Sequence, residues 1–164
     1  DNLRAEQRFE RRKAEIAYWI GCTYKAMGDI ENAKKSWTDA IAVVTVDTAS
    51  STGYRRQFDP LAAVGQQYYQ ALAKTKIGAD AENAAFYSDL LTKANEALNK
   101  TEVKAEGRPG SRALNPNTSK AMAHYAAGLA YAGQGNKSQA RAEFDQALTL
   151  VPDYLNAKIA LEQL

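Results

Sequence analysis

The sequence predicts an all-α chain of stacked helical hairpins, and three observations support this fold class. Alanine is abundant, and four prolines and ten glycines are few for 164 residues, which favours helix over strand. The long segments show a hydrophobic period of about 3.6 residues and no sustained alternation. Glycine, proline and capping residues separate these segments. We therefore expect three hairpins and a C-terminal capping helix.

The first hairpin is predicted over about residues 2–46. Its first helix, about 2–27, has an apolar face formed by Ala5, Phe9, Ile16, Ile20 and Tyr24. Gly28-Asp29 ends this helix and caps a second one over about 30–46. A small, polar loop is expected at about 47–58.

The second hairpin is expected to begin at Asp59-Pro60, with proline at the first helical position. Its first helix runs to about Ile77, and Asp80 caps a second helix to about Lys100. A long loop over about 101–118 follows, because it contains Gly107-Arg108-Pro109-Gly110 and Asn115-Pro116-Asn117.

The third hairpin is predicted from cap signals. Asn117 or Thr118 caps a helix to Ala132, and Asn136-Lys137-Ser138-Gln139 resembles a capping box that starts the next helix. Pro152 ends that helix, and Asp153 caps a terminal helix over about 153–163.

An internal repeat links the first and third hairpins. Counted from Ala121, the third hairpin offers Ala127-Gly128, Tyr131, Gly135, Ala140, Phe144, Ala147 and Pro152. Counted from Ala14, the first offers Ile20-Gly21, Tyr24, Gly28, Ala33, Trp37 and Ala40 at the same offsets, with Thr45 in place of the proline. Small residues at these positions allow close approach of the helices. We expect the aromatic residues Tyr24, Trp37, Tyr131 and Phe144 to fill the space between hairpins.

The middle hairpin is a degenerate copy. Tyr68-Tyr69-Gln70-Ala71 aligns with Tyr18-Trp19-Ile20-Gly21. One inserted residue then brings Glu82-Asn83-Ala84 opposite Glu31-Asn32-Ala33 and predicts Ala84 as a packing residue. Ser88 falls where an aromatic residue is expected.

These residues resemble the tetratricopeptide repeat (TPR) family. The resemblance implies an α-α superhelix in one domain over 1–164, with repeats at about 14–47, 64–98 and 121–154. The long loops depart from a tandem array. The layout also resembles the C-terminal repeat segment of large multidomain bacterial proteins with an upstream domain of unknown function, and a start at Asp1 suggests a fragment.

The resemblance further implies a concave groove lined by the first helix of each repeat. Carried onto this chain, its residues are Tyr18, Cys22, Lys25, Tyr68, Leu72, Lys76, Met122, Tyr125 and Leu129. Tyrosine combines wide contact area with a hydroxyl, which suits a peptide with apolar anchors. The alternative is that the tyrosines pack against the terminal helix or the long loops.

Composition and motifs argue against catalysis. One His and one Cys exclude multi-residue metal motifs, and no nucleotide-binding or nucleophile motif occurs, so we expect no enzyme activity, cofactor or metal. His124 and Cys22 are interpreted as packing residues. A net charge of +2 and the absence of a long apolar run argue against nucleic acid and a membrane span. Arg4, Arg8, Arg11 and Arg12 form a basic docking stripe or, as we favour, a solvated face.

The resulting hypothesis is a non-catalytic module that binds a peptide or protein segment. The alternative is a structural role, in which the repeats self-associate or pack on an upstream domain of a larger protein. Homo-oligomerisation stays open. No signal peptide is visible, which favours the cytoplasm, with the periplasm as the alternative if a signal peptide lies upstream.

Overall fold

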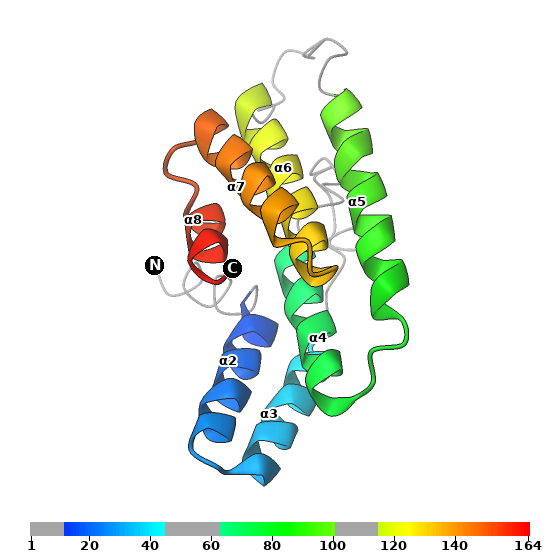
Figure 1. Ribbon diagram of the computed structural model, residues 1–164, viewed down its shortest axis with the longest axis vertical. Helices are drawn as coiled ribbons and strands as arrows, with labels where there is room; N and C mark the ends of the chain where they lie inside the picture. Colours follow the sequence, from blue (N-terminus) through cyan, green and yellow to red (C-terminus); the bar gives the residue numbers. More distant parts are fainter. Residues whose placement is uncertain (1–11, 45–62, 101–114) are drawn as a thin grey trace, which may run out of the picture. The chain divides into compact units, whose positions relative to one another are not determined.

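The computed structural model describes residues 12–44, 63–100 and 115–164, and within these ranges it contains seven helices and no strand (Figure 1). The all-α prediction is therefore confirmed. The chain divides into two compact units, Asp1–Asn83 and Ala84–Leu164. The predicted helix over 2–11, the stripe residues Arg4, Arg8 and Arg11, the loop at 47–58, the start at Asp59-Pro60 and residues 101–114 of the second loop lie outside the described residues.

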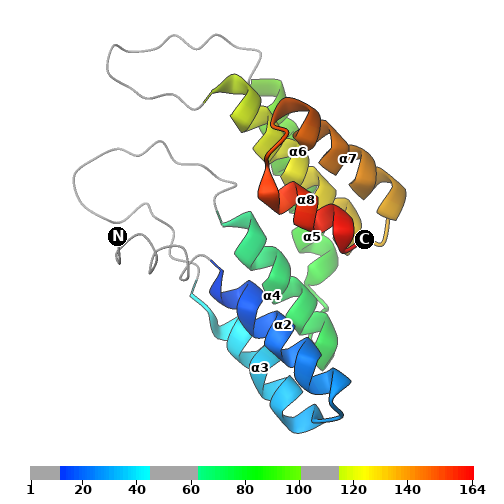
Figure 2. The ribbon, with the colours of Figure 1, turned by 90° about the vertical axis from the view of Figure 1, so that its left-hand side faces the viewer.

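Unit 1 contains α2 (Lys13–Ala26), α3 (Ile30–Ala42) and α4 (Val64–Ile77). Helices α2 and α3 form an antiparallel hairpin, and α4 lies against both of them (Figures 1 and 2). The predicted turn is confirmed, because Gly28 has a φ of 83° and the Asp29 side chain accepts a hydrogen bond from the Asn32 amide at 3.1 Å. Small and aromatic residues make up the core of this unit: Ala14, Tyr18, Ala33, Trp37, Ala40, Tyr69 and Ala73.

The crossing of α2 and α3 is filled by one indole ring. A Cβ at Gly21 would overlap the Trp37 ring, so only glycine lets the ring lie there. The indole Nε1 donates a hydrogen bond to the Tyr18 carbonyl at 3.2 Å. The prediction places Trp37 between hairpins. Its ring packs inside its own hairpin, where Gly21 leaves room for it, and also belongs to the core cluster that contains Tyr69 and Ala73 of α4.

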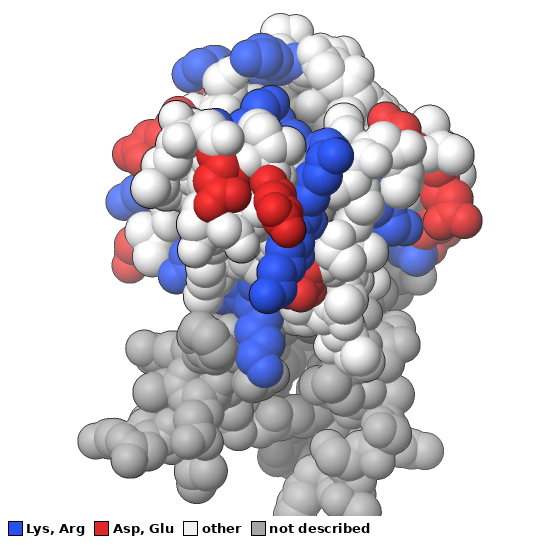
Figure 3. Space-filling view, turned by 90° about the horizontal axis from the view of Figure 1, so that it is seen from below, with Lys and Arg blue, Asp and Glu red and all other residues white. Residues whose placement is uncertain are grey.

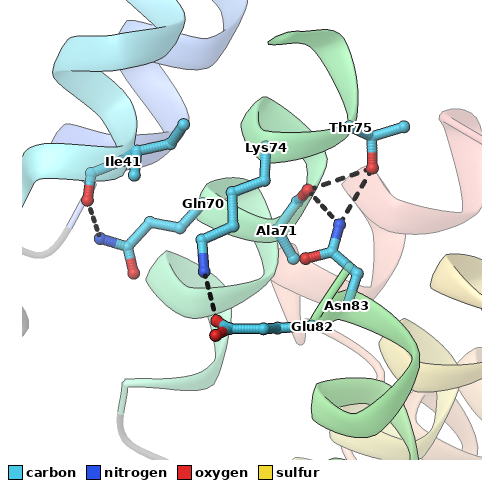
Figure 4. Close-up of polar contacts among 7 residues, drawn as sticks. All are labelled: Ile41, Gln70, Ala71, Lys74, Thr75, Glu82 and Asn83. Atoms are coloured by element: carbon cyan, nitrogen blue, oxygen red, sulfur yellow. Dashed lines mark hydrogen bonds and ion pairs between the residues drawn. The ribbon is translucent and has the colours of Figure 1, made fainter. Parts of the chain in front are cut away.

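Two glutamine side chains of α4 hydrogen-bond to the backbone at the ends of the preceding helices. The Ala14 amide, near the start of α2, donates to Gln66 Oε1 at 3.0 Å. Gln70 Nε2 donates to the carbonyl of Ile41 at 3.2 Å (Figure 4) and to that of Val43 at 2.6 Å. These contacts satisfy amide and carbonyl groups that a helix end leaves without partners. They also accompany the end of α3 at Ala42, four residues before the predicted end at about 46.

Unit 2 contains most of α5 (Asn83–Lys100), followed by α6 (Pro116–Gly133), α7 (Lys137–Leu150) and α8 (Leu155–Glu162). Helices α6 and α7 form an antiparallel hairpin in both views (Figures 1 and 2). Phe144 is fully buried against Gly128, so its ring packs inside its own hairpin. The short helix α8 packs on α7 and α6, with Ala157 fully buried.

The helix caps in unit 2 agree only in part with the predictions. Asn136 caps α7 as expected, because its side-chain amide donates to Gln139 Oε1 at 2.5 Å and its oxygen accepts from the Gln139 amide at 3.4 Å. The predicted cap of α6 at Asn117 or Thr118 is wrong. Asn115 is the cap, with Pro116 at the first helical position, because its side chain accepts from the Asn117 amide at 3.0 Å.

Two further helix starts differ from the predictions. Tyr154, rather than Asp153, occupies the N-cap position of the terminal helix α8, and only its backbone carbonyl accepts a hydrogen bond there, from the Ala157 amide at 3.0 Å. Helix α5 begins at Asn83, so Asp80 lies before a turn and not directly at the helix start. There the Asp80 backbone carbonyl accepts a hydrogen bond from the Asn83 amide at 2.9 Å.

The buried face of α5 corrects the predicted alignment of the middle repeat. Asn83, Tyr87, Leu90 and Ala94 are buried, whereas Ala84 and Ser88 are exposed. Tyr87 and Leu90 follow Trp37 and Ala40 at the same 50-residue offset that relates Tyr68 to Tyr18. The inserted residue and the predicted packing role of Ala84 are therefore wrong.

Asn83 is a polar residue at the repeat position where the first repeat has the small residue Ala33. Its Nδ2 donates to the Ala71 carbonyl at 2.7 Å and to Thr75 Oγ1 at 3.0 Å (Figure 4). Because a buried amide costs free energy unless it is hydrogen-bonded, these contacts make asparagine acceptable there. The match of Glu82-Asn83-Ala84 to the first repeat is thus a coincidence of sequence.

Candidate functional site

Four of the predicted groove residues meet on α2 and α4 in unit 1. Tyr18 is buried in the core, and Cys22, Tyr68 and Leu72 are half-buried residues packed against the same cluster. The rings of Tyr18 and Tyr68 each lie 5.6 Å from the ring of Tyr69, measured between centroids. Tyr18 is therefore the buried member of this cluster, which we call its floor, and the other three side chains are partly accessible.

The floor of this cluster is neutral. Burial raises the pKa of the Tyr18 phenol well above its ordinary value, and a hydrogen bond with the Cys22 thiol acts in the same direction. Tyr18 therefore stays uncharged at neutral pH. An apolar or hydrogen-bonding ligand suits such a floor better than a charged one.

Charge is confined to the margin of these helices. Lys25 and Lys76 are exposed in the last turns of α2 and α4. Their neighbour Lys74 forms an ion pair with Glu82 at 3.5 Å (Figure 4). Figure 3 shows acidic and basic side chains interspersed on the face that it draws. These observations agree with a ligand that is not selected by strong charge.

The three remaining candidates lie on α6 in unit 2. Met122 and Tyr125 are half-buried, and Leu129 is buried. The Tyr125 ring contacts the rings of Phe144 and Tyr154, with centroids 6.0 and 5.4 Å away. Tyr125 therefore packs beside the start of α8, which is the alternative arrangement considered for the tyrosines. Tyr18 instead packs on Tyr69 of α4.

The apolar face predicted for α2 is only partly buried. Ile20, which lies on it, is 45% exposed, whereas Ile16 and Tyr24 are half-buried and Tyr24 packs against the core of unit 1. Trp19 and Met27 are 41% and 73% exposed. The buried residues of α2 are Ala14, Tyr18 and Gly21. The exposed side chains line a groove together with Ile16, Thr23 and Tyr24. The sequence indicates this exposure in one respect, because α2 has more large apolar residues than one helix face can bury.

His124 contributes a polar contact inside a hairpin. Its Nδ1 lies 2.7 Å from Glu143 Oε2, which joins α6 to α7, and both side chains are partly buried. Within the described ranges, no group of three or more His, Cys, Asp or Glu side chains is arranged to hold a metal ion. None of the helices described there has the length and apolar character needed to span a membrane.

Comparisons with known proteins agree with this architecture. Two family models, both described as tetratricopeptide repeat, match residues 121–154 and 14–42. No curated protein and no solved structure matches the chain. The matched segments cover most of the hairpins α6–α7 and α2–α3, whose helices cross at Gly128 and Gly21. The two matches support a tetratricopeptide repeat family for this chain, whose repeats generally mediate protein–protein interactions and form a fold that is typically non-catalytic.

Proposed function

We propose that this chain binds a peptide or protein segment on the first helices of its repeats, α2, α4 and α6. The observation that carries the proposal is the cluster on α2 and α4, where Cys22, Tyr68 and Leu72 stand half-buried over Tyr18. Partly exposed aromatic and aliphatic side chains over a rigid floor are typical of binding surfaces, since they offer contact area at low entropic cost.

The ligand that fits this cluster has apolar anchors. Its floor is uncharged, and the candidate cations Lys25 and Lys76 stand at the margin. Met122 and Tyr125 are half-buried on α6, which belongs to the other unit and is a separate candidate surface. We assign Tyr18 and Leu129 a supporting role, because they are only 7% and 3% exposed.

A peptide selection followed by substitution tests this function. The immobilised full chain is screened against a random peptide library, and the affinities of the selected peptides are remeasured by calorimetry on variants. Tyr68→Ala and Tyr125→Ala are each expected to weaken binding about tenfold or more. Lys25→Glu should change affinity less, because apolar contacts dominate.

Tyr131→Ala is the matched control, since Tyr131 is also a half-buried tyrosine of a first helix but not a groove residue. Circular dichroism checks that all variants keep their helices. Selected peptides that bind Tyr68→Ala and Tyr125→Ala as well as the unmodified chain would exclude these helices as the binding site. A library that yields no binder would do so too.

A further inference from the structure

Equivalent faces of the first helices are buried differently along the chain. On α4 one such face carries Gln66, Tyr69, Gln70 and Ala73. Gln66 and Gln70 hydrogen-bond to the backbone of α2 and α3, and Tyr69 and Ala73 belong to the core that these helices form. The preceding hairpin thus covers this face of α4.

The equivalent face of α6 is also buried. The residues at the corresponding repeat positions are Ala123, Ala126, Ala127 and Ala130, and each is at most 1% exposed. At the edge of this face, the ring of Tyr87 from α5, the helix before α6, lies against Gly133. In two repeats, therefore, this face is an internal packing surface.

On α2 the same positions hold Ile16, Trp19, Ile20 and Thr23, continued by Met27 one turn later. We call these five residues the α2 stripe. Trp19, Ile20 and Met27 are 41%, 45% and 73% exposed, so the stripe is uncovered in the part of the chain that the structure describes. It lines a groove, and the residue type at each position is apolar or small.

We propose that the α2 stripe is a docking site for an α-helix of a partner polypeptide, and that the contact face of this helix consists of alanine and glycine. The proposal is independent of the peptide-binding surface, because the stripe contains none of those residues. A helix is the expected occupant, since helices cover the equivalent face of α4.

The size of the partner side chains follows from the packing inside this chain. Trp37 lies against Gly21, Phe144 against Gly128 and Tyr87 against Gly133. At each of these crossings a large ring faces a glycine, because only a small residue lets two helices approach across it. At the α2–α4 contact, by contrast, the rings of Tyr18 and Tyr69 meet with centroids 5.6 Å apart. We carry the ring-on-glycine pattern over to the α2 stripe, whose own side chains are large, and expect small ones on the opposite helix.

The stripe is continuous with an existing interface. The Trp19 ring lies 5.2 Å from the Tyr18 ring and 6.4 Å from the Tyr69 ring, in edge-to-face contacts. A helix docked on Trp19 would therefore extend an aromatic cluster that already joins α2 to α4. A rigid, partly buried aromatic anchor of this kind is typical of binding hot spots.

Charge makes a small contribution at this site. The rim of the groove holds Arg12 and Glu15, which pair with each other at 2.7 Å. The pair neutralises its own charge, so affinity is expected to depend weakly on salt. A second copy of this chain docked stripe to stripe is disfavoured, because large side chains would meet large ones.

Two synthetic amphipathic helices of about 20 residues serve as probes. One carries alanine at successive i, i+3, i+4 and i+7 positions of one face, with Glu–Lys pairs elsewhere, and the other carries leucine at the same positions. The alanine-faced peptide is expected to bind the full chain and to shift the tryptophan emission to the blue. Only two tryptophans are present and Trp37 is already buried, so Trp19 reports the contact.

Substitutions locate the binding. Ile20→Glu and Met27→Glu are each expected to weaken the alanine-faced peptide about tenfold or more. Ile30→Glu is the matched control, since Ile30 is 49% exposed on α3 and outside the groove, and it should leave affinity unchanged. The peptides selected from the random library for the peptide-binding surface should bind Ile20→Glu as tightly as the unmodified chain. This result separates the docking proposal from the proposed function.

Several outcomes would overturn the docking site: no binding of the alanine-faced peptide at millimolar concentration, equal binding by Ile20→Glu, or equal or tighter binding of the leucine-faced peptide. Sedimentation of the chain alone supplies the last test. A dimer that Ile20→Glu converts to a monomer would identify a second copy as the occupant and refute the small-faced helix.

Discussion

Replacing Gly128 by alanine tests how tightly the third hairpin is packed. In an open helix interior, glycine to alanine stabilises by about 1 kcal/mol, because glycine loses more conformational entropy on folding. Here the added Cβ would overlap the ring of Phe144, which is fully buried and cannot swing out to solvent. The two effects therefore oppose each other.

The steric effect is the larger one. Overpacking a well-packed core costs about 1–3 kcal/mol, and overlap with several carbons of one immobile ring places Gly128→Ala near the upper end of that range. After the gain in helix propensity, the net loss is about 2 kcal/mol. For a chain of this size, that loss lowers the Tm by about 4–8 °C.

Thermal and urea unfolding followed by circular dichroism measure the loss. The control is a double-mutant cycle with Phe144→Leu, which removes the ring that the new Cβ would meet. The double variant should be more stable than the sum of the single effects predicts, by about 1 kcal/mol or more. A Gly128→Ala variant more stable than the unmodified chain, or strictly additive effects, would refute the packing argument.

Two further predictions concern polar contacts of unit 1. Gln70→Ala should lower the free energy of unfolding in urea by about 1–2 kcal/mol, because the carbonyls of Ile41 and Val43 lose a partly buried donor. Gln67→Ala on the same helix is the control. Equal losses of unfolding free energy in the two variants would contradict the capping role of Gln70. Hydrogen bonds from the side chain and backbone of Asn32 lower the pKa of Asp29 in the folded chain. The contribution of Asp29 to stability is therefore present above its unfolded-state pKa of about 4, and it is lost as the pH falls through the lower folded-state pKa. Asp29→Asn keeps a capping oxygen but does not titrate, so its unfolding free energy should vary less with pH over that acidic range than that of the unmodified chain.

The sequence predicted the hairpins well where glycine and capping residues mark them. Gly28 and Asn136 act as expected, and both family matches fall on segments identified as repeats. The middle repeat was harder to align. Its core position is taken by Asn83, which is tolerated only because Ala71 and Thr75 accept its hydrogen bonds. Those partners are ten or so residues away and cannot be recognised from spacing alone.

The candidate site was predicted only in part for a related reason. A repeat position specifies which helix a residue lies on, but its exposure depends on neighbours outside the repeat. Tyr18 and Tyr125 occupy the same repeat position, yet one packs on Tyr69 of α4 and the other on Tyr154 before α8. The sequence therefore predicted a row of tyrosines without predicting their separate surroundings.

The exposure of Ile20 on the predicted apolar face of α2 has a physical cause in the packing of the hairpins. Hydrophobic periodicity gives most weight to large side chains, so it placed Ile16, Ile20 and Tyr24 on one apolar face. In closely packed hairpins the buried positions at crossings belong to small residues, as at Ala14 and Gly21 on α2 and at Ala126 and Gly128 on α6. Large residues on a first helix then remain for other partners, which is why the exposed Trp19 and Ile20 indicate a contact still to be made.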